Sequence, residues 1–388
     1  MIPASSVKGV ADERDGVSGA MRLLPDVVLG HPPSLVHCRR MTDRYGLVQF
    51  AHGATPDLDF GYCLDDNARA FLASIITLYL EPQHADAVEF GEASLRFMEA
   101  CRRPDGRFHN LMAADGSFTD EVGSQDSLGR LIWACGVAAC CAPSAQWRGR
   151  ATTLLAAALD HASDLVDLRP AAYAALGLAA AIAPALAAPI PPLEPALARP
   201  EAAVCRRILE QLCSHLAADF ASNSNDGWEW FEPRLTWGNA RLPEALLRAG
   251  AALADPGLSA AGMSSLAFLA SVTHESDRFV PIGNQGFYER GGVRAIYDQQ
   301  PIEACAMVDG WLALAALTHP LEYESKALEA FSWFLGLNTE RLALVEPESG
   351  GCRDGLGRGE LNMNMGAEST LSYVHAHAAL AAYFRRKT

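Results

Sequence analysis

Several widespread signatures are missing from this sequence of 388 residues. Its ten cysteines form no C-x-x-C pair, and no group of cysteines and histidines has the spacing of a zinc site. There is no P-loop, no G-x-G-x-x-G after a strand and no G-x-S-x-G elbow. The sequence therefore lacks the motifs that mark the common nucleotide-binding and hydrolase folds. We expect neither a cofactor nor a metal.

Basic side chains are also in deficit, with 31 Lys and Arg against 46 Asp and Glu, a formal net charge of −15. Surfaces that bind DNA or RNA concentrate Lys and Arg, so nucleic acid is not an expected partner. Residues 1–20 carry charges and lack the apolar core of a signal peptide. Several cysteines, such as Cys135 and Cys305, lie in apolar helical patterns where a free thiol acts as a small hydrophobe. We therefore expect a cytoplasmic location.

One uncharged stretch, residues 170–193, is long enough to span a bilayer. It is mostly alanine, and prolines at 184, 189, 191 and 192 interrupt it. We predict a helix over 170–183 that is buried on all sides, followed by a proline-rich loop, and no membrane insertion.

Segments with a shared pattern recur about every sixty residues. Each begins with a loop containing Gly, Pro or Asn, continues with one or two polar residues, and becomes an almost wholly apolar helix. They begin near residues 64, 124, 167, 238, 299 and 365. Amphipathic helices are predicted between them, over 86–101, 146–165, 200–220, 258–273 and 321–337.

This alternation predicts a closed ring of helix pairs. Periods of this size are typical of helical arrays, and an open array ends in polar capping repeats. The last predicted helix, 369–384, is instead apolar like an interior helix, and a ring supplies the neighbour that it needs. We predict an all-α (α/α)6 toroid with short β-hairpins in its loops, such as 46–52 and 279–288. It would form one domain over 1–388, with an irregular segment at 1–30 and a short outer helix at 33–42.

In such a ring the inner helices begin at one end, here called the mouth. Polar residues concentrate at these helix starts: Asp65, Asp66, Arg69, Gln125, Asp126, Arg130, Trp237, Asn239, Arg241, Gln300, Glu303 and Glu368. Several carboxylates around one basin repel one another, which separates their pKa values into those of an acid and a base. The alternative is that residues such as Asp65 and Asp126 are N-caps that stabilise helix starts.

Aromatic residues accompany these polar groups. The loop before the fourth inner helix holds three tryptophans, and comparable loops hold other aromatic rings: Trp228, Trp230, Trp237, Tyr62, Phe287, Tyr288 and Tyr297. Flat aromatic faces stack on the C–H faces of sugars, while nearby polar groups bind their hydroxyls. The pattern favours a saccharide ligand, although the tryptophans could instead fill the rim of the barrel.

Five motifs resemble a known family. They are GYCLDDNARA at 61–70, QDSLGR at 125–130, WGNARLPE at 237–244, GGCRDG at 350–355 and GAEST at 366–370. These motifs are similar to those of a bacterial (α/α)6 family found beside, or fused to, glycosyltransferases and mannoside-processing enzymes. The resemblance covers about residues 34–384. It implies carbohydrate activity on a six-hairpin glycosidase scaffold and association with glycosyltransferases.

The favoured hypothesis is an inverting glycoside hydrolase that acts on an oligosaccharide. One carboxyl group would protonate the leaving oxygen while another activates water. We predict Asp126 as acid or base, Glu303 or Glu368 as its partner, and Asp66 as a further catalytic candidate. The predicted sugar-binding residues are Asp65, Arg69, Gln125, Arg130, Asn239, Arg241 and Gln300, with Trp230 and Trp237 for stacking.

Three alternatives remain open at this point. A sugar epimerase or isomerase on the same toroid would favour histidine bases, and few histidines lie at the inner-helix starts. His375 and His377, two residues apart in the last helix, point to different faces, so we do not expect them to bind a metal together. A phosphorylase would use Arg130 and Arg241 to hold phosphate. The third alternative is a non-catalytic sugar-binding partner of a glycosyltransferase.

Overall fold

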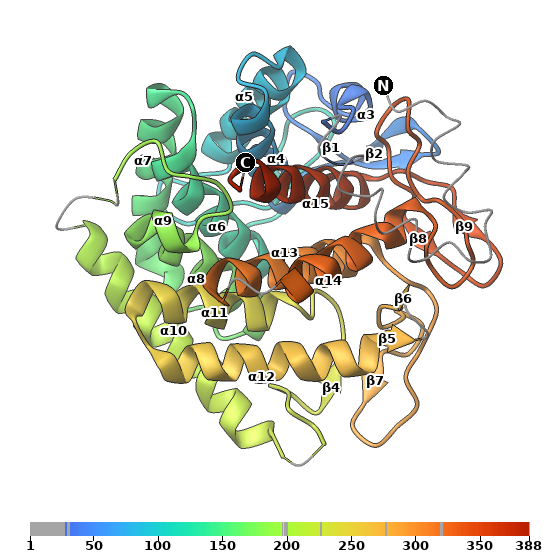
Figure 1. Cartoon of the computed structure of the whole chain (residues 1–388). Coiled ribbons are helices and arrows are strands. Elements are labelled where there is room, and N and C mark those ends of the chain that lie inside the picture. Colours follow the sequence, from blue (N-terminus) through green and yellow to red (C-terminus); the bar gives the residue numbers. More distant parts are fainter. Residues whose placement is uncertain are drawn as a thin grey trace.

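The computed structural model describes residue 28 and residues 32–195, 197, 201–225, 227–275, 278–318 and 321–387. Most of the predicted irregular segment at 1–30 lies outside this range. Within it the chain forms an all-α (α/α)6 toroid with a few short strand pairs, as predicted (Figure 1).

The inner ring consists of the apolar helices that the repeat predicts. They are α4 (Leu64–Leu80), α6 (Gln125–Cys141), α8 (Leu168–Ile182), α11 (Arg241–Leu253), α13 (Pro301–Thr318) and α15 (Ala367–Arg385). Each packs on the next, and α15 packs on α4, so the ring closes. Helix α13 is long and apolar enough to cross a membrane by composition, but most of it is buried inside this ring.

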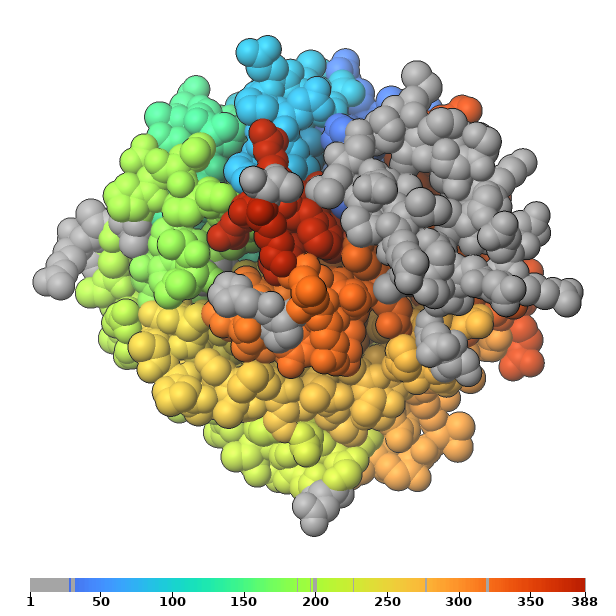
Figure 2. All heavy atoms as spheres, viewed as in Figure 1, coloured from blue at the N-terminus to red at the C-terminus, as the bar shows by residue number. Residues whose placement is uncertain are grey.

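Each inner helix has an outer helix packed against it. The outer helices are α3 (Val36–Arg40), α5 (Ala85–Ala100), α7 (Ala145–Ala162), α10 (Glu201–Asn223), α12 (Pro256–Thr273) and α14 (Leu321–Ser332), which continues into the 3-10 turn η1 (Trp333–Leu335). A one-turn helix, α9 (Pro184–Ala187), interrupts the proline-rich loop after α8. With all atoms drawn, α12 and α14 are seen on the same face of the molecule (Figure 2).

The strands are short and lie mainly at one end of the ring, where the inner helices begin (Figure 1). β1 (Val48–His52), β2 (Thr55–Cys63) and β3 (Leu111–Met112) form an antiparallel sheet. The other antiparallel pairs are β4 (Arg234–Leu235) with β7 (Tyr288–Glu289), β5 (His274–Glu275) with β6 (Arg278–Phe279), and β8 (Gly355–Leu356) with β9 (Leu361–Asn362). The predicted hairpin over 279–288 is therefore wrong, because Tyr288 pairs with the segment before α11.

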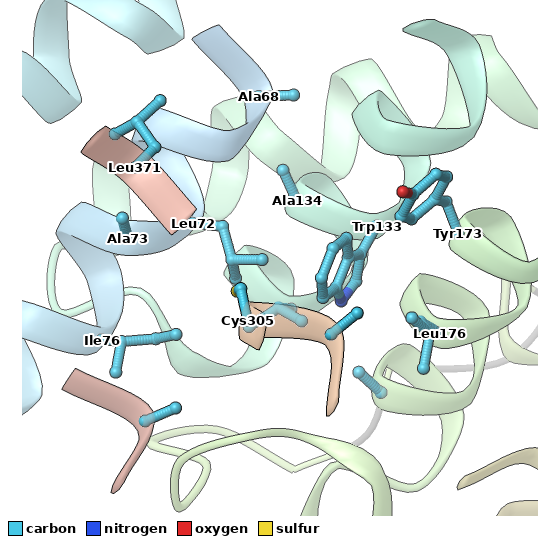
Figure 3. Packing of buried hydrophobic residues seen from close by; sticks show 14 of the residues in the cluster. Ala68, Leu72, Ala73, Ile76, Trp133, Ala134, Tyr173, Leu176, Cys305 and Leu371 are labelled. Atoms are coloured by element: carbon cyan, nitrogen blue, oxygen red, sulfur yellow. The ribbon is translucent and has the colours of Figure 1, made fainter. Parts of the chain in front are cut away.

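The centre of the ring is filled by buried side chains of the inner helices. Figure 3 shows residues of α4, α6, α8, α13 and α15 converging there, with Trp133 beside Tyr173. Helices α6 and α8 approach most closely at two glycines. A Cβ on Gly136 would lie 2.1 Å from the carbonyl oxygen of Gly177, so only glycine fits this contact. The ten cysteines are buried free thiols.

Candidate functional site

A cavity of about 300 Å³ opens at the mouth of the ring. Four carboxylates line it from the first turns of α4, α6, α13 and α15: Asp65, Asp126, Glu303 and Glu368. Arg69, Arg130, Thr236, Trp237, Ile282, Asn284, Phe287, Gln300 and Ile302 complete the wall. The predicted convergence of polar helix starts is therefore present.

The aspartates at the helix starts are not N-caps. The N-cap of α4 is Cys63, and the N-cap of α6 is Ser124, whose side chain accepts a hydrogen bond from the Ser127 N–H. Asp65 and Asp126 instead lie in the first turn, where the helix dipole favours negative charge while the side chain stays available. The N-cap interpretation is wrong for these residues.

Asp126 is held by a single partner. The Nε of Arg130 donates to its Oδ2 at 2.8 Å, and Oδ1 is buried without a hydrogen-bond partner. Arg130 is in turn fixed by aromatic rings, because its Cζ lies 4.0 Å from the centre of the Tyr173 ring and 6.0 Å from that of Trp237. Asp126 therefore has one oxygen held by Arg130 and a second, buried oxygen that accepts no hydrogen bond from the described residues.

Arg69 connects the first and last inner helices. Its guanidinium donates to Asp66 and to Glu368 and lies 3.5 Å from Asp65 Oδ2. Burial raises the pKa of Asp66 to about 6 although Arg69 opposes this, whereas Arg69 and Arg130 outweigh burial at Asp65 and lower its pKa. Two adjacent carboxyls thus differ in acidity, as crowding in one basin predicts.

Glu303 is the most enclosed carboxylate of the cavity. Its Oε1 accepts from the Gly238 N–H, and its Oε2 accepts from Asn239 Nδ2 at 2.9 Å and from the Asn239 N–H at 3.4 Å. Burial raises the pKa of Glu303, and these donors offset part of that rise. Gly238 has φ of +58°, a conformation that favours glycine and turns its N–H toward Glu303.

Two further carboxylates lie beside cavity residues, Asp354 near Glu368 and Asp298 next to Gln300. Asp354 Oδ1 accepts from the Gly366 N–H at 2.7 Å, and Asp298 Oδ2 accepts from Gln300 Nε2 at 3.0 Å. Burial raises the pKa of both, and the charges of Glu368 and Asp298 add to the rise at Asp354. This acidic edge was not among the predicted site residues.

Eight predicted site residues line the cavity: Asp65, Arg69, Asp126, Arg130, Trp237, Gln300, Glu303 and Glu368. Asp66 and Asn239 lie behind this wall, as the partners of Arg69 and Glu303. Gln125 lines a separate cavity, where its Oε1 accepts from the Val166 N–H at 2.7 Å. Trp230 is fully buried against Phe231 and Phe268, so its predicted stacking on a sugar is not possible in this structure.

Arg241 lies deeper in the ring than predicted. Its Nη1 donates to Glu244 Oε2 and Asp309 Oδ2, both at 2.6 Å, and its Nη2 donates to Cys305 Sγ at 3.3 Å. His375 Nε2 lies 2.7 Å from the same Asp309 oxygen. His375 and Arg241 lower the pKa of Asp309 despite its burial. Arg241 thus anchors a charged layer below the cavity and does not orient a ligand within it.

Some wall residues carried little sequence signal. Thr236, Ile282, Asn284 and Ile302 were not predicted, and Phe287 was noted for its aromatic ring alone. Arg169, also missed, donates to the Trp237 carbonyl and to Glu232 at 2.8 Å, which holds the Trp237 loop. It occupies the third inner-helix start, at the position where other repeats carry acidic residues.

Two acidic clusters could hold a metal by proximity, Cys305–Asp309–His375 and Cys63–Asp65–Asp66. In each, an arginine already supplies the positive charge. Arg241 donates to Cys305 and Asp309, and Arg69 pairs with Asp65 and Asp66. These donor sets fit an internal guanidinium better than an ion.

A larger cavity of about 690 Å³ lies outside the ring between α12, α13 and α14. Its deeper wall is apolar, with Met307, Trp311 and Leu314. None of the converging helix starts reaches it. The mouth cavity is therefore the better candidate for chemistry.

Neither a protein-family model nor a curated protein matches the sequence. Solved structures do share the fold. A cellobiose 2-epimerase from Spirochaeta thermophila aligns with a TM-score of 0.68 at 13% identity, covering 96% of this chain and 98% of that chain. A D-mannose isomerase aligns with a TM-score of 0.62 at 12% identity, covering 97% of this chain and 98% of that chain. A GH76 α-mannanase from Bacteroides thetaiotaomicron aligns with a TM-score of 0.61 at 9% identity, covering 95% of this chain and 97% of that chain. At these identities the likeness establishes the toroid fold.

Proposed function

We propose that this chain is a carbohydrate-active enzyme that binds the end of a saccharide in the mouth cavity. The observation that carries the proposal is Asp126, a carboxylate at the cavity wall with one oxygen fixed by Arg130 and the other unpartnered. A volume of about 300 Å³ suits one or two sugar units. Trp237 and Phe287 supply aromatic faces, and Gln300 and Asn284 supply hydrogen-bonding groups.

The cavity's own side chains favour hydrolysis. One carboxyl would give its proton to the glycosidic oxygen as the bond from that oxygen to the anomeric carbon breaks. A second would take a proton from water while the water oxygen bonds to the same carbon. We propose Asp126 for one role and Glu303 or Glu368 for the other. Association with glycosyltransferases stays a prediction.

The comparisons support epimerisation or isomerisation better than hydrolysis, because the cellobiose 2-epimerase and the D-mannose isomerase align with TM-scores of 0.68 and 0.62, against 0.61 for the α-mannanase. In that reaction a base removes the proton next to the carbonyl of an open-chain sugar and an acid returns a proton at another face or atom. Asp126 would again be the leading candidate for the base. Among the described residues that line the cavity there is no histidine, so carboxyls would have to do this work.

Proton NMR of the purified protein with manno-, gluco- and galacto-oligosaccharides, each with and without phosphate, tests these reactions. Hydrolysis produces new reducing ends, phosphorolysis requires phosphate, and an epimerase or isomerase interconverts sugars without cleaving a bond. In deuterium oxide the latter also exchanges a carbon-bound proton.

Asp126→Asn, Glu303→Gln and Glu368→Gln test the residues. We expect Asp126→Asn to reduce turnover by a factor of about 100 or more, the usual size of acid or base catalysis. Glu210→Gln, at an exposed carboxylate of outer helix α10, is the control and should keep full activity. Full turnover in all three cavity variants would exclude the assignment.

A further inference from the structure

Two buried oxygens next to the cavity have no hydrogen-bond partner. They are Asp126 Oδ1 and the hydroxyl oxygen of Tyr173, Oη. Native proteins rarely bury an unpaired polar atom, because the atom loses water and gains nothing in return. Two such atoms on neighbouring residues therefore point to a group that binds there.

Both residues contact the same guanidinium. Arg130 Nε donates to the other oxygen of Asp126 at 2.8 Å, and Arg130 Cζ lies 4.0 Å from the centre of the Tyr173 ring. Tyr173 also stacks on Trp133, with 5.6 Å between ring centres and 21° between planes (Figure 3). The Tyr173 ring is thus held by two contacts while its hydroxyl is left unused.

The Tyr173 hydroxyl also lies beside the backbone that holds Glu303. A Cβ on Gly238 would be 3.3 Å from Oη, and the Gly238 N–H donates to Glu303. Residue 238 is therefore a glycine at a point where a side chain would crowd the hydroxyl. Oη thus lies beside the backbone segment that binds Glu303, while the ring that carries it lies against the guanidinium that binds Asp126.

We propose that one hydroxyl group, from the sugar or from the reacting water, binds between Asp126 Oδ1 and Tyr173 Oη. It would donate its proton to Asp126 Oδ1 and accept a hydrogen bond from Tyr173, which becomes a further ligand-binding residue. Oδ1 is buried in the sugar-free structure, and because a carboxyl torsion is broad, the proposal requires the Asp126 carboxyl to turn when the hydroxyl binds. Inorganic phosphate is a poor occupant of a cavity whose wall carries four acidic side chains. This inference rests on the proposed function.

Tyr173→Phe is the direct test, since it removes the hydroxyl and keeps the ring on Trp133 and Arg130. Tyr323→Phe is the matched control, because Tyr323 stacks on Trp311 at 5.6 Å and 12° on the outer side of α13. Stability would be measured by urea unfolding without sugar. Binding and turnover would be measured with the saccharide from the panel that raises the unfolding midpoint most.

Without sugar, Tyr173→Phe should be at least as stable as the wild type, because the lost hydroxyl has no partner. With a sugar hydroxyl in the site, the dissociation constant rises roughly three- to tenfold, the usual worth of one hydrogen bond. With water in the site, the dissociation constant stays the same and kcat falls by a similar factor. Either result supports the inference.

The inference is overturned if Tyr173→Phe destabilises the sugar-free protein more than Tyr323→Phe does, since the hydroxyl would then have an internal partner. Unchanged binding and unchanged kcat would overturn it as well, while leaving the proposed function intact. A wild-type protein that neither binds nor converts any saccharide would overturn the proposed function and this inference with it.

Discussion

The carboxyl of Asp66 is buried behind the cavity wall, so Asp66 affects the cavity only by accepting a hydrogen bond from Arg69. Burial holds its pKa at about 6 against an ordinary value of 3.8. A carboxyl whose pKa is raised in the folded state stabilises that state while it is protonated. The contribution is present below about pH 4 and is lost as the pH rises through about 6.

Asp66→Asn removes this titration. The free energy of unfolding of the wild type, minus that of the variant, should fall by about 2–3 kcal/mol as the pH rises from about 4 to 7. Urea unfolding at several pH values measures the difference. The exposed Asp59→Asn serves as the comparison and should show a much flatter difference. A difference that grows with pH would mean that Asp66 is stabilised as the anion.

At this scale the sequence predicted residue type and helix start better than side-chain direction. Asp126 and Glu303 belong to the first turns of inner helices. In a closed ring these first turns lie at the mouth, so the position of both residues follows from the fold. Arg241 has the same position in the pattern, yet its long side chain extends down the axis to Asp309, 68 residues further along the chain. Such a partner leaves no trace in local spacing. Trp230 is likewise buried by α12, through Phe268.

At the scale of the element, the contact between α6 and α8 depends on two glycines. A Cβ on Gly177 would lie 2.2 Å from the Ile132 carbonyl oxygen, so the two backbones touch without side chains between them. Alanine is the better helix former, but here it would force the helices apart.

We expect Gly177→Ala to lower the free energy of unfolding by about 1–3 kcal/mol, as overpacking does. Gly149→Ala, on the exposed face of outer helix α7 with nothing within 4 Å, should raise it by about 0.5–1 kcal/mol. Thermal and urea unfolding of both variants provide the measurement. Equal effects of the two substitutions would show that the close contact carries no strain.

The helices were predictable because their apolar runs and their first residues are features of the local sequence. Pro301 begins α13, and the predicted outer helix at 258–273 is observed as Pro256–Thr273. The connections were not predictable in the same way. Residues 280–300 have no periodicity, yet Ile282, Asn284 and Phe287 fold over the cavity, and Gly283 N–H donates to the Ala295 carbonyl at 2.8 Å. Their placement depends on contacts that form only once the ring exists.

For the whole molecule, Arg69 is a polar link where the ring closes, at the opposite end of α4 from the bonds that Arg385 donates to the Tyr79 and Leu80 carbonyls. It joins Asp66 of α4 to Glu368 of α15, which are separated by about 300 residues of chain. Its loss would leave neighbouring carboxylates without a counter-charge in a mostly buried setting.

Arg69→Met should therefore lower the free energy of unfolding by about 3–5 kcal/mol. Arg39→Met removes a half-exposed pair between α3 and α5 and should cost at most about 1 kcal/mol. Chemical unfolding followed by circular dichroism distinguishes the two. Comparable small losses would mean that the ring closes without Arg69, through apolar packing and the bonds from Arg385.

The charged layer around Arg241 and Asp309 limits the route that a ligand of the mouth cavity can take. Together with Trp133 and the side chains of Figure 3 it blocks the axis of the ring. A small pocket at the far end, which Asp309 and Arg248 help to line, shares no residue with the mouth cavity. A ligand of the mouth cavity would therefore enter and leave through the same opening. On the proposed function, a sugar unit bound innermost can leave only after the unit nearer the mouth has left, which sets an order of release.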